Sequence, residues 1–123
     1  KMNTLNVDQL QASKRDDPET IVIDIRIRSE FETGHVPGAF NIPAFVRTEE
    51  GEVQPVRDPF LRQVTKRFAD KNERIYVCCS HGELSMDATR WMVGAGYRNA
   101  VNVQGGFTAW EASGFPTEQG PPA

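Results

Sequence analysis

The chain has 123 residues, of which 38% are hydrophobic and 25% are charged, and its 14 basic and 17 acidic residues leave a formal net charge of −3. This composition is ordinary for a globular domain that buries a core, and the acidic balance argues against a dedicated nucleic-acid binder, which carries a basic face. No apolar run approaches the roughly 18 residues that a membrane-spanning helix requires, so we expect neither nucleic acid nor a membrane as a partner.

The amino-terminal part of the chain predicts a strand, a helix and a second strand. A short strand around Thr4–Leu5 precedes a helix that extends to about Ser13, and Asn6 and Gln9 resemble a capping pair for this helix. The run Ile21–Ile25, "IVIDI", is short and β-branched. Such runs are typical of strands that are buried on both faces of a parallel sheet.

The middle of the chain continues this alternation. Ser29–Gly34 has a cap residue at its start and a glycine at its end, which favours a short helix, and Gly38–Pro43 is a strand candidate. Residues 44–57 show little periodicity, so we expect a loop there. A longer helix then begins, with Asp58 as its cap and Pro59 at the first helical position, where proline is tolerated.

This longer helix is amphipathic and carries many charges. Leu61, Val64 and Phe68 recur at helical spacing and form its apolar side. The basic residues clustered here are Arg62, Lys66, Arg67, Lys71 and Arg74. Because Asp58, Asp70 and Glu73 are interleaved with them, we interpret the cluster as a solvated helix face rather than a binding patch.

The carboxyl-terminal part predicts two more strands and two more helices. Arg74–Cys78 and Ala100–Gln104 are strand candidates, and Ser85–Ala95 is an apolar-sided helix that stops at Gly96. "GFTAWEASG", residues 106–114, is a last short helix, in which Phe107 and Trp110 form core or the wall of a pocket.

Strands that alternate with helices predict an α/β fold, with a mostly parallel sheet and helices on both faces. We expect one domain over residues 1–116 and a disordered tail, "TEQGPPA", over residues 117–123. Functional sites of such sheets form at the carboxyl ends of the strands. The segment "YVCCSHGELS", residues 76–85, lies at one of these ends.

Cys78 and Cys79 are the only two cysteines, and adjacent cysteines cannot form a disulfide framework. A reducing compartment is the simpler assumption, and the cytoplasm, the plastid stroma and the mitochondrial matrix all fit it. The chain starts with no signal-peptide pattern, although trimming would hide one. Because side chains alternate along a strand, the two thiols should point in different directions, with Cys78 packed in the core.

Cys79 is the first residue beyond the apolar strand, and a polar loop separates it from the next helix. Such a loop can turn its N–H groups inward as an anion-binding nest, to which the helix that begins near Ser85 adds its positive end. A thiol held there is pushed towards the thiolate. Gly82 suits a backbone conformation that other residues avoid. On these residues alone, Cys79 is either a nucleophile or a loop cysteine without a chemical role.

Three stretches, in order along the chain, resemble the rhodanese family. "VIDIRIRSEFETGHVPGAFNIP" (Val22–Pro43) is similar to the family's amino-terminal signature, and "GYRNAVNVQGGFTAWEASGFP" (Gly96–Pro116) is similar to its carboxyl-terminal signature. Between them, "CSHGELS" (Cys79–Ser85) is in register with the family's active-site loop. The long loop and the helix "DPFLRQVTKRF" also resemble the plant-type single-domain members.

This resemblance implies a five-stranded, mostly parallel sheet and a sulfurtransferase that carries sulfane sulfur as a persulfide on Cys79. The small-molecule donor would be thiosulfate or a persulfide, and the acceptor would be cyanide, a small thiol or a thiol-bearing protein. No cofactor and no metal are implied, and we expect a monomer. The residues implied in substrate binding are the loop residues Ser80, His81, Gly82, Glu83, Leu84 and Ser85, together with Arg26.

The loop departs from the family pattern at one position. Leu84 stands where active members often have Arg, Thr or Ser, and Glu83 adds negative charge beside an anion site. Loss of a charged hydrogen bond costs about 1.5–3 kcal/mol. We therefore expect a persulfide carrier with weak thiosulfate activity. His81, if protonated, offsets part of this loss, and otherwise it is an ordinary loop residue.

Other charged residues allow two interpretations each. Arg26 either contacts an anion in the pocket or forms an internal ion pair with Glu30. His35, in the turn-rich "GHVPGA", is expected to fix its turn by hydrogen bonds rather than to act as a base. Arg47 and Arg57, from the 44–57 loop, are candidates to overhang the site and replace the missing loop charge.

Two other classes of function remain open. A phosphatase on this fold needs an arginine at the end of its cysteine loop, but Leu84 and Ser85 occupy the positions that would carry it. A non-catalytic binding or regulatory module is favoured by Glu83 and Leu84. It is opposed by the intact Cys79, Gly82 and Ser85.

Overall fold

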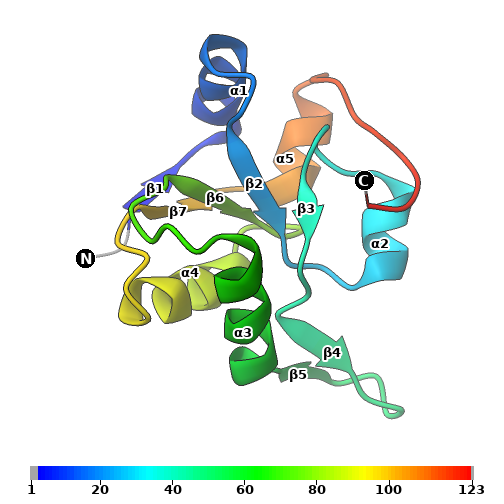
Figure 1. The fold of residues 1–123 in the computed structure, drawn as a ribbon. Coiled ribbons are helices and arrows are strands. Elements are labelled where there is room, and N and C mark those ends of the chain that lie inside the picture. Colours follow the sequence, from blue (N-terminus) through cyan, green and yellow to red (C-terminus); the bar gives the residue numbers. More distant parts are fainter. Residues whose placement is uncertain (1–2, 123) are drawn as a thin grey trace.

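The computed structural model describes residues 3–122, in which strands and helices alternate (Figure 1). The elements in chain order are β1 (Asn3–Leu5), α1 (Val7–Asp16), β2 (Ile21–Asp24), α2 (Arg28–Thr33), β3 (Phe40–Asn41), β4 (Phe45–Arg47), β5 (Val53–Pro55), α3 (Arg57–Arg67), β6 (Ile75–Cys78), α4 (Leu84–Gly94), β7 (Ala100–Val103) and α5 (Gly106–Ala112). No helix within residues 3–122 is both long enough and apolar enough to cross a bilayer.

The central sheet has five strands in the order β1-β7-β6-β2-β3, and every neighbouring pair is parallel. The predicted α/β architecture is therefore confirmed. Asp24 at the end of β2 pairs with Cys78 at the end of β6, so these two strands finish at the same edge. The segments that follow them are thereby brought together.

Helices cover both faces of the sheet: α3 and α4 lie on one side, and α1, α2 and α5 lie on the other (Figure 1). The side chains of β6 alternate between the two cores. Ile75, Val77 and Cys79 belong to the core beneath α3 and α4, whereas Tyr76 and Cys78 belong to the opposite core. The two thiols therefore lie on opposite faces of the sheet, as the alternation predicts.

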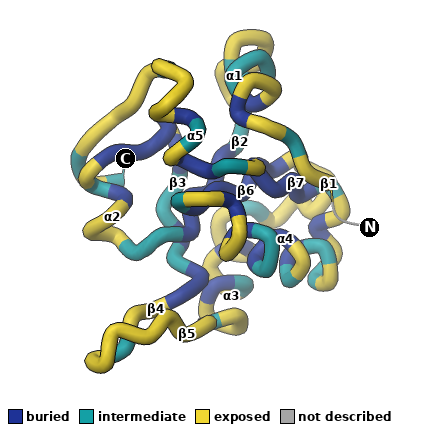
Figure 2. Tube along the Cα trace, turned by 180° about the vertical axis from the view of Figure 1, so that it is seen from behind, coloured by how far each residue is buried: buried dark blue, intermediate teal, exposed yellow. Residues whose placement is uncertain are grey.

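The predicted loop over residues 44–57 is instead a β-hairpin. β4 and β5 pair antiparallel, with Phe45 opposite Pro55 and Arg47 opposite Val53. Figure 2 shows this hairpin as a largely exposed arm, separate from the buried sheet. Strands this short, with polar residues between them, leave no clear two-residue alternation in the sequence.

Two helix starts also differ from the prediction. Helix α3 begins at Arg57, so Asp58 and Pro59 lie inside its first turn, and the capping position belongs to Val56, which makes no side-chain cap. Helix α4 begins at Leu84, one residue earlier than expected. The short α1 has the predicted capping box, in which Asn6 and Gln9 exchange hydrogen bonds.

The tail differs from the predicted disorder because it is bonded to the body of the protein as far as Gly120. Glu118 forms an antiparallel bridge with His35, through backbone hydrogen bonds of 2.8 and 2.9 Å. The N–H of Gly120 donates to the carbonyl of Glu32. The glycine- and proline-rich composition of the tail predicted disorder. The sequence could not reveal these contacts, because their partners lie far away along the chain.

Candidate active site

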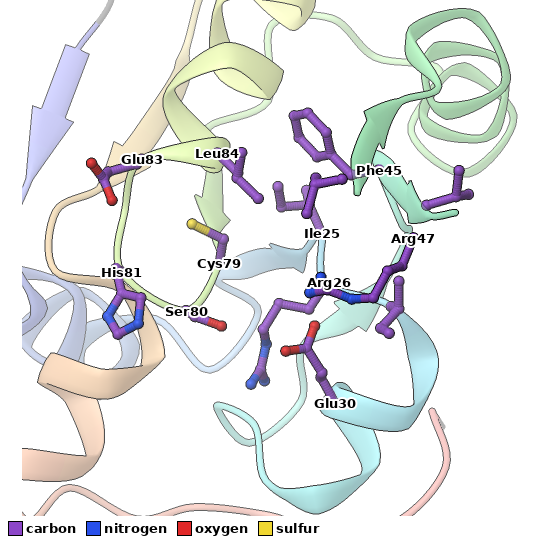
Figure 3. Close-up of a pocket in the computed structure, with 13 residues that line it drawn as sticks. Ile25, Arg26, Glu30, Phe45, Arg47, Cys79, Ser80, His81, Glu83 and Leu84 are labelled. Carbon is purple, nitrogen blue, oxygen red and sulfur yellow. The ribbon is translucent and has the colours of Figure 1, made fainter. Parts of the chain in front are cut away.

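Cys79 lies directly after β6, at the carboxyl edge of the sheet, and only 3% of its surface is exposed. Its Sγ accepts hydrogen bonds from the backbone N–H of Gly82 (3.1 Å) and of Ser85 (3.3 Å). Figure 3 shows the loop from Ser80 to Leu84 curled around this sulfur. The expected nest of inward N–H groups is therefore present, and it stabilises negative charge on Sγ.

The opposite side of this loop is held by the first turn of α5. The N–H of Phe107 donates to the carbonyl of Cys79 (2.8 Å), and the N–H of Thr108 donates to the carbonyl of Ser80 (3.0 Å). Both carbonyls therefore point away from the sulfur. The start of the loop is thereby anchored to α5, while the N–H groups further along it, of Gly82 and Ser85, face Sγ.

Two glycines make this close contact possible. Gly82 has φ +92°, and a Cβ there would lie 2.8 Å from the backbone nitrogen of Gly105. Gly106 has φ +61°, and a Cβ there would lie 2.6 Å from the carbonyl oxygen of Ser80. Both the backbone conformation and the available space exclude a side chain at these positions.

Asn102, which the sequence analysis did not single out, joins the loop to β7. Its Nδ2 donates to the carbonyl of Gly82 (3.2 Å), and its Oδ1 accepts from the Ser85 hydroxyl (2.6 Å). A carbonyl can only accept, so Gly82 fixes which way the amide of Asn102 points. The available signal was an asparagine in the middle of a fully buried strand, "AVNV".

The hydroxyl of Ser85 is the link between Asn102 and the sulfur. Its oxygen accepts a hydrogen bond from the Cys79 thiol (3.2 Å) while its one hydrogen is given to Asn102. Cys79, Ser85 and Asn102 are all buried. When Cys79 loses its proton, the same hydrogen of Ser85 can serve either the thiolate or Asn102, but not both.

The neighbouring Cys78 has a different environment. It is buried in the opposite core, and its Sγ donates to the carbonyl of Cys79. Burial raises the pKa of the Cys78 thiol well above its ordinary value, and the charge of Asp24 adds to the shift. A thiol that stays protonated is a poor nucleophile. Of the two cysteines, Cys79 is therefore the one suited to covalent chemistry.

Arg26 has a different partner from the one predicted. Its guanidinium forms a two-pronged ion pair with Asp24, with Nη2 2.7 Å from Oδ2, and Nη2 also donates to the carbonyl of Gly34 (2.7 Å). Burial opposes the charge, but the hydrogen bond and charge of Asp24 outweigh it and raise the pKa of Arg26. The prediction of an ion pair with Glu30 was wrong. The carboxylate of Asp24, two residues before Arg26 at the end of the same strand, binds the guanidinium instead.

The prediction that His35 fixes its turn is confirmed. Its Nδ1 lies 2.8 Å from the carbonyl oxygen of Phe31, and its ring stacks on that of Phe31. Its Nε2 lies 3.3 Å from the Glu118 carboxylate. Among the described residues, no group of three or more His, Cys, Asp or Glu side chains is placed to hold a metal ion.

A pocket of about 330 Å³ opens beside Cys79. Of the predicted binding residues, Arg26, Ser80, His81, Glu83 and Leu84 line it, whereas Gly82 and Ser85 contact the sulfur from inside the loop. Arg47 lines the pocket as well (Figure 3). Arg57 is not among the lining residues and lies 3.2 Å from Asp58.

The chain matches the family model described as "Rhodanese-like domain" over residues 6–113. The chain belongs to the rhodanese family. It is 37% identical over 105 residues to "Thiosulfate sulfurtransferase 18" of Arabidopsis thaliana, covering 82% of this chain and 75% of that protein. It is 34% identical over 96 residues to "Thiosulfate sulfurtransferase 16, chloroplastic" of the same plant, covering 78% of each chain.

The solved structures agree with the rhodanese fold. A rhodanese-like domain from Anabaena sp. superposes with a TM-score of 0.76 at 24% identity, covering 97% of this chain and 80% of that one. This rhodanese-like chain spans only about half of some other curated plant relatives, such as 51% of a senescence-associated protein of Raphanus sativus. The remaining half of such relatives has no counterpart in this sequence.

We predict that Gly106→Ala unfolds the sulfur-binding loop. The new methyl group would meet backbone atoms of Cys79 and Ser80, and the positive φ would add strain, so stability should fall by about 2 kcal/mol or more, as measured by urea unfolding. Gly94→Ala is the matched control, because Gly94 lies in α4 with nothing within 4 Å of the new Cβ. Equal effects of the two variants would contradict a special role for Gly106.

Cys78 should make stability decrease at high pH. An unfolded chain ionises this thiol near its ordinary pKa of 9.0, whereas the folded chain keeps it protonated to higher pH. The stability that this thiol contributes is therefore present below that value and is lost as the pH rises above it, by roughly 1 kcal/mol at pH 10. Urea unfolding at pH 7 and pH 10 should show this additional loss in the wild type and not in Cys78→Ala. An equal loss in both proteins would contradict the assignment.

Asn102 should restrain the reactivity of Cys79 through Ser85. In Asn102→Ala the Ser85 hydroxyl is free to donate to the thiolate, so alkylation of Cys79 at pH 7, located by mass spectrometry, should become several-fold faster. In a Ser85→Ala background the same substitution should change the rate little. A rate increase that persists without Ser85 would show loosening of the loop instead of control through the hydroxyl.

Proposed function

We propose that this rhodanese-like protein is a sulfurtransferase that carries a sulfane sulfur as a persulfide on Cys79. The observation that carries this proposal is the cradle of Cys79, whose Sγ receives two backbone N–H groups and borders an open pocket. The names of the two thiosulfate sulfurtransferase relatives support the same class of reaction.

The reaction proceeds in two displacements on sulfur. The Cys79 thiolate attacks the outer sulfur of the donor, a new S–S bond forms, and the donor's S–S bond breaks with its electron pair leaving on sulfite when the donor is thiosulfate. The acceptor, cyanide or a thiolate, then attacks the outer sulfur of the persulfide. The electron pair of that S–S bond returns to Sγ, and the starting thiolate is restored.

The loop supports both displacements by electrostatics that are fixed before the reaction. The N–H groups of Gly82 and Ser85 face the sulfur that gains and loses negative charge. Because α5 and Asn102 hold the loop, these donors need no rearrangement during the reaction. Removing one donor of this kind from a comparable anion site costs roughly 100- to 1000-fold in rate.

A non-catalytic binding module is the second candidate, and one observation favours it. Leu84, which carries no charge, is 39% exposed at the mouth of the pocket, and the neighbouring Glu83 is acidic, so a dianionic donor meets no cation from either residue. Such a module would keep the fold without forming a persulfide. A mass increase of one sulfur atom on Cys79 distinguishes the two candidates.

The phosphatase alternative has no support from the geometry. Ser85 binds the cysteine sulfur where a phosphatase would carry its arginine, and the hydroxyl cannot grip several phosphate oxygens. The first arginine further along is Arg90, which pairs with Asp87 on the exposed side of α4. We expect no hydrolysis of an aryl phosphate.

The test of the proposed function is sulfur transfer to cyanide by the wild type and two single variants. Thiocyanate formation should be lost in Cys79→Ser, because the hydroxyl cannot form a persulfide, and it should be kept in Cys78→Ser. The donors should include thiosulfate and an organic thiosulfonate, and persulfide on Cys79 should be followed by mass spectrometry. Absence of persulfide with every donor would favour the binding module.

A further inference from the structure

Three apolar side chains meet around one opening. Within residues 3–122, the large hydrophobic residues with more than about a third of their surface exposed are Val46 (43%), Val53 (45%) and Leu84 (39%). All three line the pocket beside Cys79, although they come from β4, from β5 and from the start of α4. Exposed apolar residues that gather in one place mark a binding surface, whereas scattered ones do not.

The wall continues inward with further apolar residues. Ile25, Ile27 and Phe45 line the same pocket, and Figure 3 shows Leu84 and Phe45 on the side of Cys79 that faces the hairpin. The side chains of His81 and Glu83 lie on the outer side of the loop in the same view. An occupant that reaches Sγ through the pocket therefore contacts mainly hydrocarbon.

The charges of the pocket are balanced and do not favour a small dianion. Of the described residues that line it, the arginines are Arg26 and Arg47 and the carboxylates are Glu30 and Glu83. The guanidinium of Arg26 is bound to Asp24 and to the carbonyl of Gly34. Arg47 donates to the carbonyl of Gly51 within its own hairpin. The donors that face Sγ are the uncharged backbone N–H groups of Gly82 and Ser85, which suit a single negative charge better than two.

The size of the pocket agrees with an organic occupant. Its volume is about 330 Å³, within the range of roughly 300–1,000 Å³ that is usual for sites of small organic ligands. Inorganic thiosulfate would leave most of this space, and most of the apolar wall, in contact with water. Filling the wall with an apolar group releases that water and adds affinity.

We propose that the pocket selects a monoanionic organic sulfur donor, whose apolar group lies against Leu84, Val46 and Val53, over inorganic thiosulfate. This inference rests on the proposed sulfurtransferase function and names its substrate class. For an organic thiosulfonate, R–SO₂–S⁻, the Cys79 thiolate attacks the terminal sulfur. The Cys79 S–S⁻ persulfide forms, the donor's S–S bond breaks, and the sulfinate R–SO₂⁻ leaves with the electron pair.

The test compares three donors that share the same reacting sulfur. Thiosulfate and methanethiosulfonate differ mainly in charge, whereas methanethiosulfonate and benzenethiosulfonate carry equal charge and differ in apolar size. We expect kcat/KM for persulfide formation on Cys79 to rise in this order, with benzenethiosulfonate at least about tenfold above thiosulfate. Rates with each donor in the absence of protein are subtracted, because these donors differ in intrinsic reactivity.

Variants of the pocket residues test whether the apolar wall causes the preference for organic donors. Val46→Thr/Val53→Thr should lower the benzenethiosulfonate to methanethiosulfonate ratio about threefold or more, and Leu84→Arg should raise the rate with thiosulfate about tenfold. Val93→Thr makes the same change at a partly buried position on α4 that does not line the pocket. It should leave the ratios unchanged.

Each outcome has a distinct meaning. The expected order of donors, reduced by the hairpin variant and kept by Val93→Thr, would support the proposal. Persulfide formed from thiosulfate at least as fast as from benzenethiosulfonate would overturn the substrate class and leave the sulfurtransferase function standing. An unchanged ratio in the hairpin variant would also overturn it, and would indicate that the apolar rim contacts something other than the donor. Persulfide formed from no donor would overturn both proposals.

Discussion

The geometry of the Cys79 site depends on two hydrogen bonds, which the first turn of α5 donates to the carbonyls of Cys79 and Ser80. These hydrogen bonds tie the start of the loop to α5 and hold it on the path that brings the N–H groups of Gly82 and Ser85 to Sγ. The contact requires Gly106, whose missing side chain lets the two backbones meet. The paired glycines of "QGGF" are therefore part of the sulfur site, although they lie far from Cys79 in the sequence.

The same geometry separates two cysteines that are neighbours in the chain. Alternation along β6 sends Cys78 into one core and Cys79 towards the other. Cys78 has an acidic neighbour, Asp24, whereas Cys79 has N–H donors. Both thiols are buried, and burial together with Asp24 raises the pKa of Cys78, whereas the N–H donors around Cys79 offset the cost of burying a negative charge there.

Much of the fold and of the sulfur loop was predictable, because those features are encoded locally. Strand and helix periods identified the sheet, and the cysteine, glycine and serine of the loop marked the cradle. Asn102 and the tail contact of Glu118 were missed, since each depends on a residue that only folding brings near, whereas the Asp24 partner of Arg26 was missed although it lies only two residues away. The hairpin of β4 and β5 was missed for a different reason: its strands are too short to show a period.

The structure builds the surroundings of the Cys79 sulfur and the wall of the pocket from different elements. The cradle for sulfur is built from β6, β7, α4 and α5, whereas much of the pocket wall comes from the exposed arm of β4 and β5. Few constraints of packing act on Val46 and Val53, so substitutions there change the wall at little cost to folding. Under the proposed function, substitutions in the arm would change which sulfur donor the pocket accepts while the cradle of Cys79 stays the same.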